Sequence, residues 1–340
     1  MRSRLRFLML SLALVAVFPA FGVGAPPSTF EPASVLIFPL YDAGPASQTA
    51  ITVTNTCLSD DECPGDPGPL EGEVLAAFVY VDPERNVVFE RPELLTPRDT
   101  LTVFASQHNP EARRGYVLVI ARNPSTFPDA GENVAFDWLV GSALVAQADR
   151  DAVWSYRACP FLAADGVDDL CDRRVTDLDG DGAPDFDGIE YVGFPREVIV
   201  PAFFEESGPF ENSLVLVSTL PSDRRPEIRY ELRNNRGILW ADDVVLDENW
   251  WLGSLAEIAP QAADVGGDVI ELGRPPVVTG WLTLYGRRAF DPSGNPDENL
   301  VPPILGVFRE RVRSRGFETG HALVGRGEMD GLEGPFGNQQ

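Results

Sequence analysis

The sequence predicts an all-β protein built from two tandem antiparallel β-sandwich domains of the immunoglobulin-like kind. Short runs rich in β-branched and aromatic residues are separated, roughly every 8–14 residues, by Pro, Gly, Asn or Asp. Sustained helical periodicity is nearly absent. A length of 340 residues suits two domains of ~150 residues each. We therefore expect about seven strands per domain, paired into sheets that pack face to face.

An internal repeat supports the division into two domains. Residues 35–55 and 198–218 each contain an apolar run with a proline near its end, at Pro39 and Pro201. A Gly-Pro pair and an alternating apolar run follow in both segments. We interpret this order as a duplication, although two unrelated β domains can share such a rhythm.

The other predicted strands follow the same order in both halves. Two hairpins are expected at 76–90 and 227–241, the second with a turn at 234–237. The other extended segments that we predict are 101–104, 115–120 and 136–148 in the first half, and 250–258 and 280–285 in the second. A helix is the alternative for 136–148, where Gly141 and the β-branched residues near it favour a strand.

The N-terminus has the features of a secretory signal peptide. Arg2, Arg4 and Arg6 precede a 12-residue apolar run at 7–18, and small residues follow up to Ala25. Cleavage after Ala25 or after Gly24 would release a secreted or periplasmic protein. No second apolar run of 18 or more residues exists, so we expect no stable membrane anchor.

The charge balance excludes one class of partner. The chain has 52 acidic and 27 basic residues, all of the latter arginine, for a net charge of −25. So negative a protein repels phosphate backbones, and we expect no nucleic-acid partner. A hydrophobic fraction of 44% is enough for packed cores.

Four cysteines fit an oxidising compartment. They enclose a short loop, Cys57 to Cys63, and a longer one, Cys159 to Cys171. Three pairings are possible, and closeness along the chain favours the two local disulfides. Zinc binding is the alternative, which the spacing and the absence of a nearby histidine disfavour.

One acidic segment carries a pattern of metal ligands. Residues 177–188 read DLDGDGAPDFDG. Loop positions 1, 3 and 5 are aspartates, position 6 is glycine and position 9 is again aspartate, a spacing that gathers oxygen ligands for Ca²⁺. The candidate ligands are Asp177, Asp179, Asp181, the backbone carbonyl of Ala183, Asp185, Asp187 and Glu190.

This segment resembles the calcium loops of thrombospondin type 3 repeats and, more loosely, those of dockerins and EF-hands. The resemblance covers about a dozen residues and implies Ca²⁺ as the cofactor. It departs at position 12, where those loops place an acidic residue and this chain has Gly188. Asp187 or Glu190 is expected to fill that position.

These features give five predicted regions. They are a signal peptide at 1–25, a first sandwich at 30–158, a linker with a disulfide and the calcium loop at 159–190, a second sandwich at 191–324, and a disordered acidic tail at 325–340. We expect calcium to stiffen the linker and to set the angle between the sandwiches.

No catalytic motif is evident. The two histidines, His108 and His321, lie outside known metal and nucleophile motifs. We therefore expect an exported, non-catalytic structural or interaction protein whose partner is an extracellular protein or polysaccharide. Beyond the acidic loop the chain resembles uncharacterised bacterial exported β-sandwich proteins. The alternatives are a calcium-dependent carbohydrate-binding module, which would need an exposed Trp250 or Trp251, and a secreted glycan-active enzyme.

Overall fold

The protein is all-β, with antiparallel sheets arranged as sandwiches. The computed structural model describes residues 32–58, 72–84, 86–111, 113–124, 130–164, 174–206, 209–266, 278–312 and 317–328. The predicted signal peptide lies outside these residues. No helix among the described residues combines the length and the apolar character needed to cross a bilayer.

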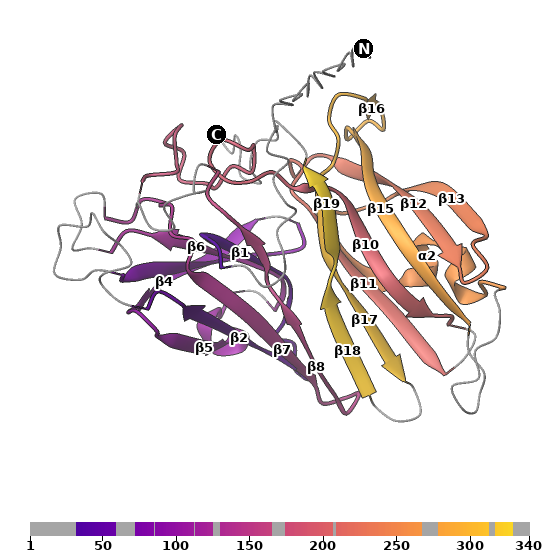
Figure 1. Cartoon of the computed structure of the whole chain (residues 1–340), viewed down its shortest axis with the longest axis horizontal. Helices are drawn as coiled ribbons and strands as arrows, with labels where there is room; N and C mark the ends of the chain where they lie inside the picture. Colours follow the sequence, from indigo (N-terminus) through magenta and orange to yellow (C-terminus); the bar gives the residue numbers. More distant parts are fainter. Residues whose placement is uncertain are drawn as a thin grey trace, which may run out of the picture.

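Nine strands form the N-terminal unit, which packs two sheets against each other (Figure 1). One sheet has the order β4-β3-β6-β1-β9 and the other β5-β2-β7-β8. The elements are β1 (Val35–Asp42), β2 (Ser47–Asn55), β3 (Val74–Val81), β4 (Val87–Leu95), β5 (Thr100–Phe104), α1 (Ala105–His108), β6 (Arg114–Arg122), β7 (Leu139–Gln147), β8 (Ala152–Arg157) and β9 (Cys159–Phe161).

Strands β10 to β19 form the C-terminal unit, which lies beside the first (Figure 1). Its sheets have the orders β13-β12-β15-β10-β19, with β16 added to β15, and β14-β11-β17-β18. The elements are β10 (Pro195–Phe204), β11 (Phe210–Ser218), β12 (Arg225–Asn234), β13 (Leu239–Val245), β14 (Trp250–Ser254), α2 (Leu255–Ile258), the 3₁₀-helix η2 (Pro260–Ala263), β15 (Thr279–Phe290), β16 (Pro296–Asp297), β17 (Ile304–Val312), β18 (Phe317–Ala322) and β19 (Val324–Glu328).

The two units have the same strand order, with β1 to β6 taking the places of β10 to β15. Strands β7, β8 and β9 likewise take the places of β17, β18 and β19. Even an irregularity recurs, because the register of β1 with β6 shifts at 38–41 and that of β10 with β15 shifts at 200–203. Each shift contains the proline of the repeat, which has no N–H to donate and suits a bulge.

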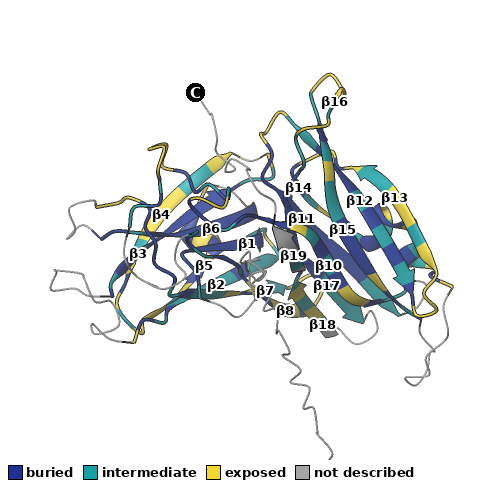
Figure 2. Ribbon diagram, turned by 45° about the horizontal axis from the view of Figure 1, so that its top comes forward, coloured by how far each residue is buried: buried dark blue, intermediate teal, exposed yellow. Residues whose placement is uncertain are grey.

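Strand β11, in the four-stranded sheet of the C-terminal unit, is buried on both faces from Asn212 to Ser218 (Figure 2). Alternate residues of a strand point to opposite faces. In β11, Leu214 and Leu216 enter the core of their own unit, whereas Val215 and Val217 join the core of the N-terminal unit. The two units therefore share one continuous apolar boundary, which hydrophobic burial stabilises.

Polar groups and close packing complete this boundary. Trp250 is buried there, and its indole Nε1 donates to the carbonyl oxygen of Pro39 at 2.8 Å. Strand β18 lies against β8, where Gly320 faces the ring of Trp154 so closely that a Cβ at this position would overlap it. Trp251 points the other way and packs, partly buried, on the C-terminal core.

Several predicted boundaries differ from the observed ones. Residues 250–258, predicted as a strand, divide into β14 and α2, whose first turn is fixed by a capping box between Ser254 and Glu257. Cys159–Phe161, placed in the linker, forms β9 on the edge of the first sheet. Residues 325–328, placed in the tail, belong to β19 and pair with β10. The segment 136–148 contains β7, as predicted.

Candidate metal centre

The acidic loop is fastened to the N-terminal unit by backbone hydrogen bonds. Thr176 donates its backbone N–H to the carbonyl oxygen of Asn133 at 2.9 Å. The side-chain amide of Asn133 in turn donates from Nδ2 to the carbonyl oxygen of Gly182 at 3.3 Å. At the far end, Val192 donates to Leu162, and Ala163 forms an isolated bridge with Tyr191. The loop is therefore a folded part of this unit.

Aromatic residues anchor the loop from below. The rings of Phe186 and Phe194 lie 4.8 Å apart, and each contacts the ring of Phe161 at 4.6 Å and 4.9 Å respectively. Tyr191 packs on Phe186 and bonds the Thr176 hydroxyl at 2.6 Å. All four rings are fully buried, so the loop rests on the core of the N-terminal unit.

The aspartates at loop positions 1, 3 and 5 shape the turns. Asp177 accepts hydrogen bonds from the backbone N–H groups of Gly180 at 2.8 Å and Gly182 at 2.9 Å. Both glycines adopt positive φ, 78° and 80°, which residues with a Cβ rarely do. Asp179 accepts from the N–H of Asp181 at 3.1 Å. These Asx turns bend the chain back towards its own start.

Glu190 is the buried member of the loop, with only 4% of its surface exposed. Its carboxylate accepts from the backbone N–H of Leu178 at 2.6 Å and of Asp185 at 3.1 Å, so it ties both arms of the loop together. Burial raises the pKa of Glu190, and the nearby charges of Asp185 and Asp177 act in the same direction. The two backbone hydrogen bonds oppose this rise.

The fold brings three carboxylates to one point. Asp177, Asp179 and Glu190 each offer an oxygen atom, and these oxygens all lie within 4.8 Å of one another. Asp179 is exposed, Asp177 is half-buried and Glu190 is buried. An all-oxygen set of this kind fits a hard cation such as Ca²⁺, whose charge would offset the repulsion among the three groups.

The remaining predicted ligands are placed differently. Asp187 uses Oδ1 to accept from the backbone N–H groups of Ile189 and Glu190, at 2.7 Å and 3.0 Å. Asp181 similarly accepts from Ala183 at 2.7 Å. The carbonyl oxygen of Asp185 accepts from the N–H of Tyr191 at 3.1 Å. Of the two residues expected to replace Gly188, Glu190 is therefore the one that joins the cluster.

Asn133 was not predicted as part of this region. Its amide holds the Gly182 carbonyl, and its Oδ1 accepts from Arg122 Nε at 3.0 Å. It lies 49 residues from Gly182 along the chain. No local spacing could have indicated it, because the contact exists only once β6 and the loop have been packed together.

His108 belongs to a separate buried network. Its Nδ1 lies 2.9 Å from the Tyr80 hydroxyl, and its Nε2 lies 3.2 Å from Glu93 Oε1. Burial lowers the pKa of His108, so the ring is neutral at physiological pH. Tyr80 is fully buried, so its hydroxyl does not face solvent. His321 is exposed on β18 and bonds Thr319 at 3.0 Å.

The predicted disulfides each include a residue outside the described part of the chain. Cys57 is buried beside the N-terminal core, and Cys159 begins β9. Cys63 and Cys171 fall outside the described residues. Between the two described cysteines no disulfide is formed.

Comparison with known proteins assigns no relative to this chain: no family model matches it, and no curated protein does.

Proposed function

We propose that this is an exported, non-catalytic interaction protein in which one calcium ion braces the acidic loop of the N-terminal unit. The observation that carries the proposal is the convergence of Asp177, Asp179 and Glu190, whose oxygens lie within 4.8 Å of one another. A loop with this ligand spacing and three gathered carboxylates suits Ca²⁺ better than Mg²⁺, because Ca²⁺ accepts larger and less regular oxygen shells. The Ala183 carbonyl, Asp181 and Asp185 are the candidates for the remaining ligands.

The ion would act on the N-terminal unit and not on the angle between the units. The loop's backbone hydrogen bonds described above go to Asn133 and Leu162, both in that unit. The boundary between the units is formed elsewhere, by Val215, Val217 and Trp250 against the N-terminal core. We therefore replace the expected calcium-stiffened hinge with a calcium-stiffened loop on one sandwich.

A duplication would explain the matching units. We propose that two immunoglobulin-like units arose from one ancestral sandwich. The shared strand order and the matching register shifts at 38–41 and 200–203 support this origin. The resulting exported protein would bind an extracellular protein or a polysaccharide. Export is inferred from Arg2, Arg4 and Arg6 and the apolar run that follows them.

The tryptophan pair does not favour the carbohydrate-binding alternative. Trp250 is 4% exposed and is occupied by its hydrogen bond to Pro39, so it offers no stacking face to a sugar. Trp251 is partly buried on the C-terminal core.

Calcium titration of the purified protein by calorimetry tests the metal site. We expect saturable binding of about one ion and a rise in thermal stability on calcium addition, because an ion that binds only the folded state stabilises it. Asp179→Asn keeps the acceptor for the Asp181 N–H and removes one charge, so calcium affinity should fall by about tenfold or more.

Asp149→Asn is the matched control, because Asp149 is an exposed acid away from the loop. Equal calcium affinity of the wild type and Asp179→Asn would remove the site. Equal losses in Asp179→Asn and Asp149→Asn would mean that only the general negative charge attracts the ion.

A further inference from the structure

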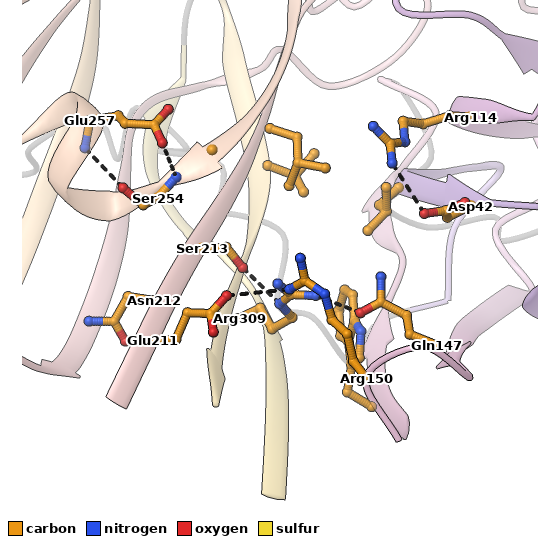
Figure 3. A pocket seen from close by; sticks show the side chains of 15 residues that line it. Asp42, Arg114, Gln147, Arg150, Glu211, Asn212, Ser213, Ser254, Glu257 and Arg309 are labelled. Atoms are coloured by element: carbon orange, nitrogen blue, oxygen red, sulfur yellow. Dashed lines mark hydrogen bonds and ion pairs between the residues drawn. The ribbon is translucent and has the colours of Figure 1, made fainter. Parts of the chain in front are cut away.

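A cleft of about 320 Å³ opens between the two units, away from the acidic loop. Figure 3 shows Asp42 and Arg114 of the N-terminal unit on one side and Ser254 and Glu257 of the C-terminal unit on the other. Arg309, on β17, lies between them. The volume is at the lower end of the range for small-molecule sites, and clefts between domains are common places for such sites.

Two of the three cleft arginines are paired with carboxylates. Arg114 Nη2 lies 3.5 Å from Asp42 Oδ2. Arg150 Nη1 lies 3.3 Å from Glu211 Oε1, an ion pair that crosses from one unit to the other. Each pair is close to neutral, so neither arginine supplies a free positive charge to the cleft.

Arg309 is the exception. Its Nε donates to Ser213 Oγ at 2.7 Å and its Nη1 to Gln147 Oε1 at 3.0 Å, and both partners are neutral. Its guanidinium lies 5.8 Å from the centre of the Trp154 ring. Among the described residues, no carboxylate comes within 4.0 Å of it.

The surroundings of Arg309 leave its charge incompletely compensated. Burial is the main cause that lowers the pKa of Arg309, and the charge of Glu318 opposes it most strongly. The charges of Arg150 and Arg311 act in the same direction as burial, and Glu211 acts against it. A guanidinium has five N–H donors in a planar fork, and only two of its nitrogens are hydrogen-bonded here. A carboxylate from solution is the group that best matches the open side of such a fork.

We propose that this cleft binds a small hydroxylated carboxylate of sugar-acid type, with Arg309 as the anchor for the carboxylate. The other lining groups include donors and acceptors, among them Ser254, Gln147 and Glu257. Hydroxyl groups both donate and accept hydrogen bonds, so they match this mixed lining better than purely apolar or purely charged groups do. The site is built by both units, because Gln147 and Ser213 hold the same guanidinium from opposite sides of the boundary.

The test is a calorimetric titration of the full chain with D-galacturonate, D-galactose, succinate and sulfate at constant ionic strength. A chelator is present throughout, so that the outcome is independent of the calcium proposal. We expect galacturonate to bind and galactose, which lacks the carboxylate, to bind at least about tenfold more weakly. Succinate should bind less tightly than galacturonate, because it cannot use the hydroxyl contacts.

Two substitutions in the cleft change affinity in opposite directions. Arg309→Gln should weaken galacturonate binding by about tenfold or more, because it removes the anchor charge. Glu257→Gln should strengthen binding by a few fold, because it removes a negative charge from the lining while glutamine can retain the capping box with Ser254. Glu257→Gln still tests whether galacturonate binds in this cleft if Arg309→Gln does not fold.

Arg98→Gln is the matched control, because it also removes one arginine charge. Arg98 is exposed and does not line the cleft. It should bind galacturonate as the wild type does. Equal losses in both arginine variants, binding of galactose as tight as that of galacturonate, or binding of sulfate alone would each overturn the proposal.

Discussion

The indole nitrogen of Trp250 donates a hydrogen bond of 2.8 Å to the carbonyl oxygen of Pro39, 211 residues away along the chain. Both residues are buried, and the bond crosses the boundary between the two units. Pro39 lies in the stretch of β1 where the register with β6 shifts, so its carbonyl is available to a partner outside that ladder. A bulge in one sandwich thus provides the acceptor that orients the other.

Replacing Trp250 with Phe tests how much this hydrogen bond contributes to the stability of the folded protein. The substitution leaves the Pro39 carbonyl buried without its donor and shortens the ring, so we expect a loss of about 1–3 kcal/mol in the free energy of unfolding. Urea unfolding monitored by circular dichroism measures it. Trp281→Phe, at a tryptophan that is 37% exposed on β15, is the control and should cost much less. Equal losses would show that the Pro39 contact contributes little.

Gly320→Ala probes the contact between β18 and β8. A Cβ at residue 320 would overlap the Trp154 ring and approach the Ser155 carbonyl, so the strands must separate. Overpacking of this kind costs typically about 1–3 kcal/mol. Thermal unfolding should show a lower Tm than for Thr319→Ala, which changes an exposed side chain on the same strand. A Tm at or above that of the wild type would mean that the two strands are not closely packed in solution.

Glu310 gives the C-terminal unit a dependence on pH. Burial raises the pKa of Glu310 to about 7, against an ordinary value of 4.5, although its Oε1 accepts a hydrogen bond from the Phe204 N–H at 3.0 Å. The folded protein therefore holds this proton more tightly than the unfolded chain does. The stability that the proton contributes is fully present below about pH 4.5 and is lost as the pH rises through 7.

Glu310→Gln should remove this loss, because glutamine keeps an oxygen acceptor for Phe204 and carries no charge. We expect the variant to gain on the order of 1–2 kcal/mol relative to the wild type between pH 5.5 and pH 8.5. Urea unfolding at both pH values measures the change. Glu248→Gln, an exposed substitution, is the control. A difference between Glu310→Gln and the wild type that does not vary with pH would contradict the prediction.

His108 makes stability depend on pH in the direction opposite to Glu310. Burial holds its pKa below the ordinary value of 6.5, so the unfolded chain takes up a proton that the folded protein resists. The contribution of this residue is complete above pH 6.5 and declines as the pH falls below it. His108→Gln should weaken this decline between pH 7 and pH 5, measured as the urea midpoint at each pH.

Removing the histidine also disturbs its partners, so a loss of stability at pH 7 is expected in that variant. Tyr80→Phe separates the two effects. It leaves His108 Nδ1 without its hydroxyl partner at 2.9 Å and should cost about 1–3 kcal/mol, while the pH dependence of the histidine remains. A change in stability between pH 7 and pH 5 that is the same in His108→Gln and in the wild type would contradict the assignment of a buried, neutral ring.

Much of the local structure follows from the sequence alone. Alternating apolar runs predicted extended segments, and the turn of the second hairpin was evident from Asn234 to Gly237. In this turn, Asn234 Oδ1 accepts hydrogen bonds from the backbone N–H groups of Arg236 and Ile238, and Gly237 has a φ of 76°. The spacing of Asp177 and Asp179 similarly predicted that their carboxylates would converge. Each of these features depends on residues within a few positions of one another.

The tertiary structure decided which face of each strand meets which neighbour. Val215 and Leu216 are adjacent and both apolar. Val215 nevertheless contacts the core of the N-terminal unit, whereas Leu216 contacts the core of its own, C-terminal unit. Likewise, the burial of Glu190, the part played by Asn133 and the place of Arg309 between Ser213 and Gln147 arise from contacts between distant segments. Periodicity and turn chemistry are short-range properties that the order of residues determines. The pairing of surfaces depends on the packing of the whole chain, and no local pattern encodes it.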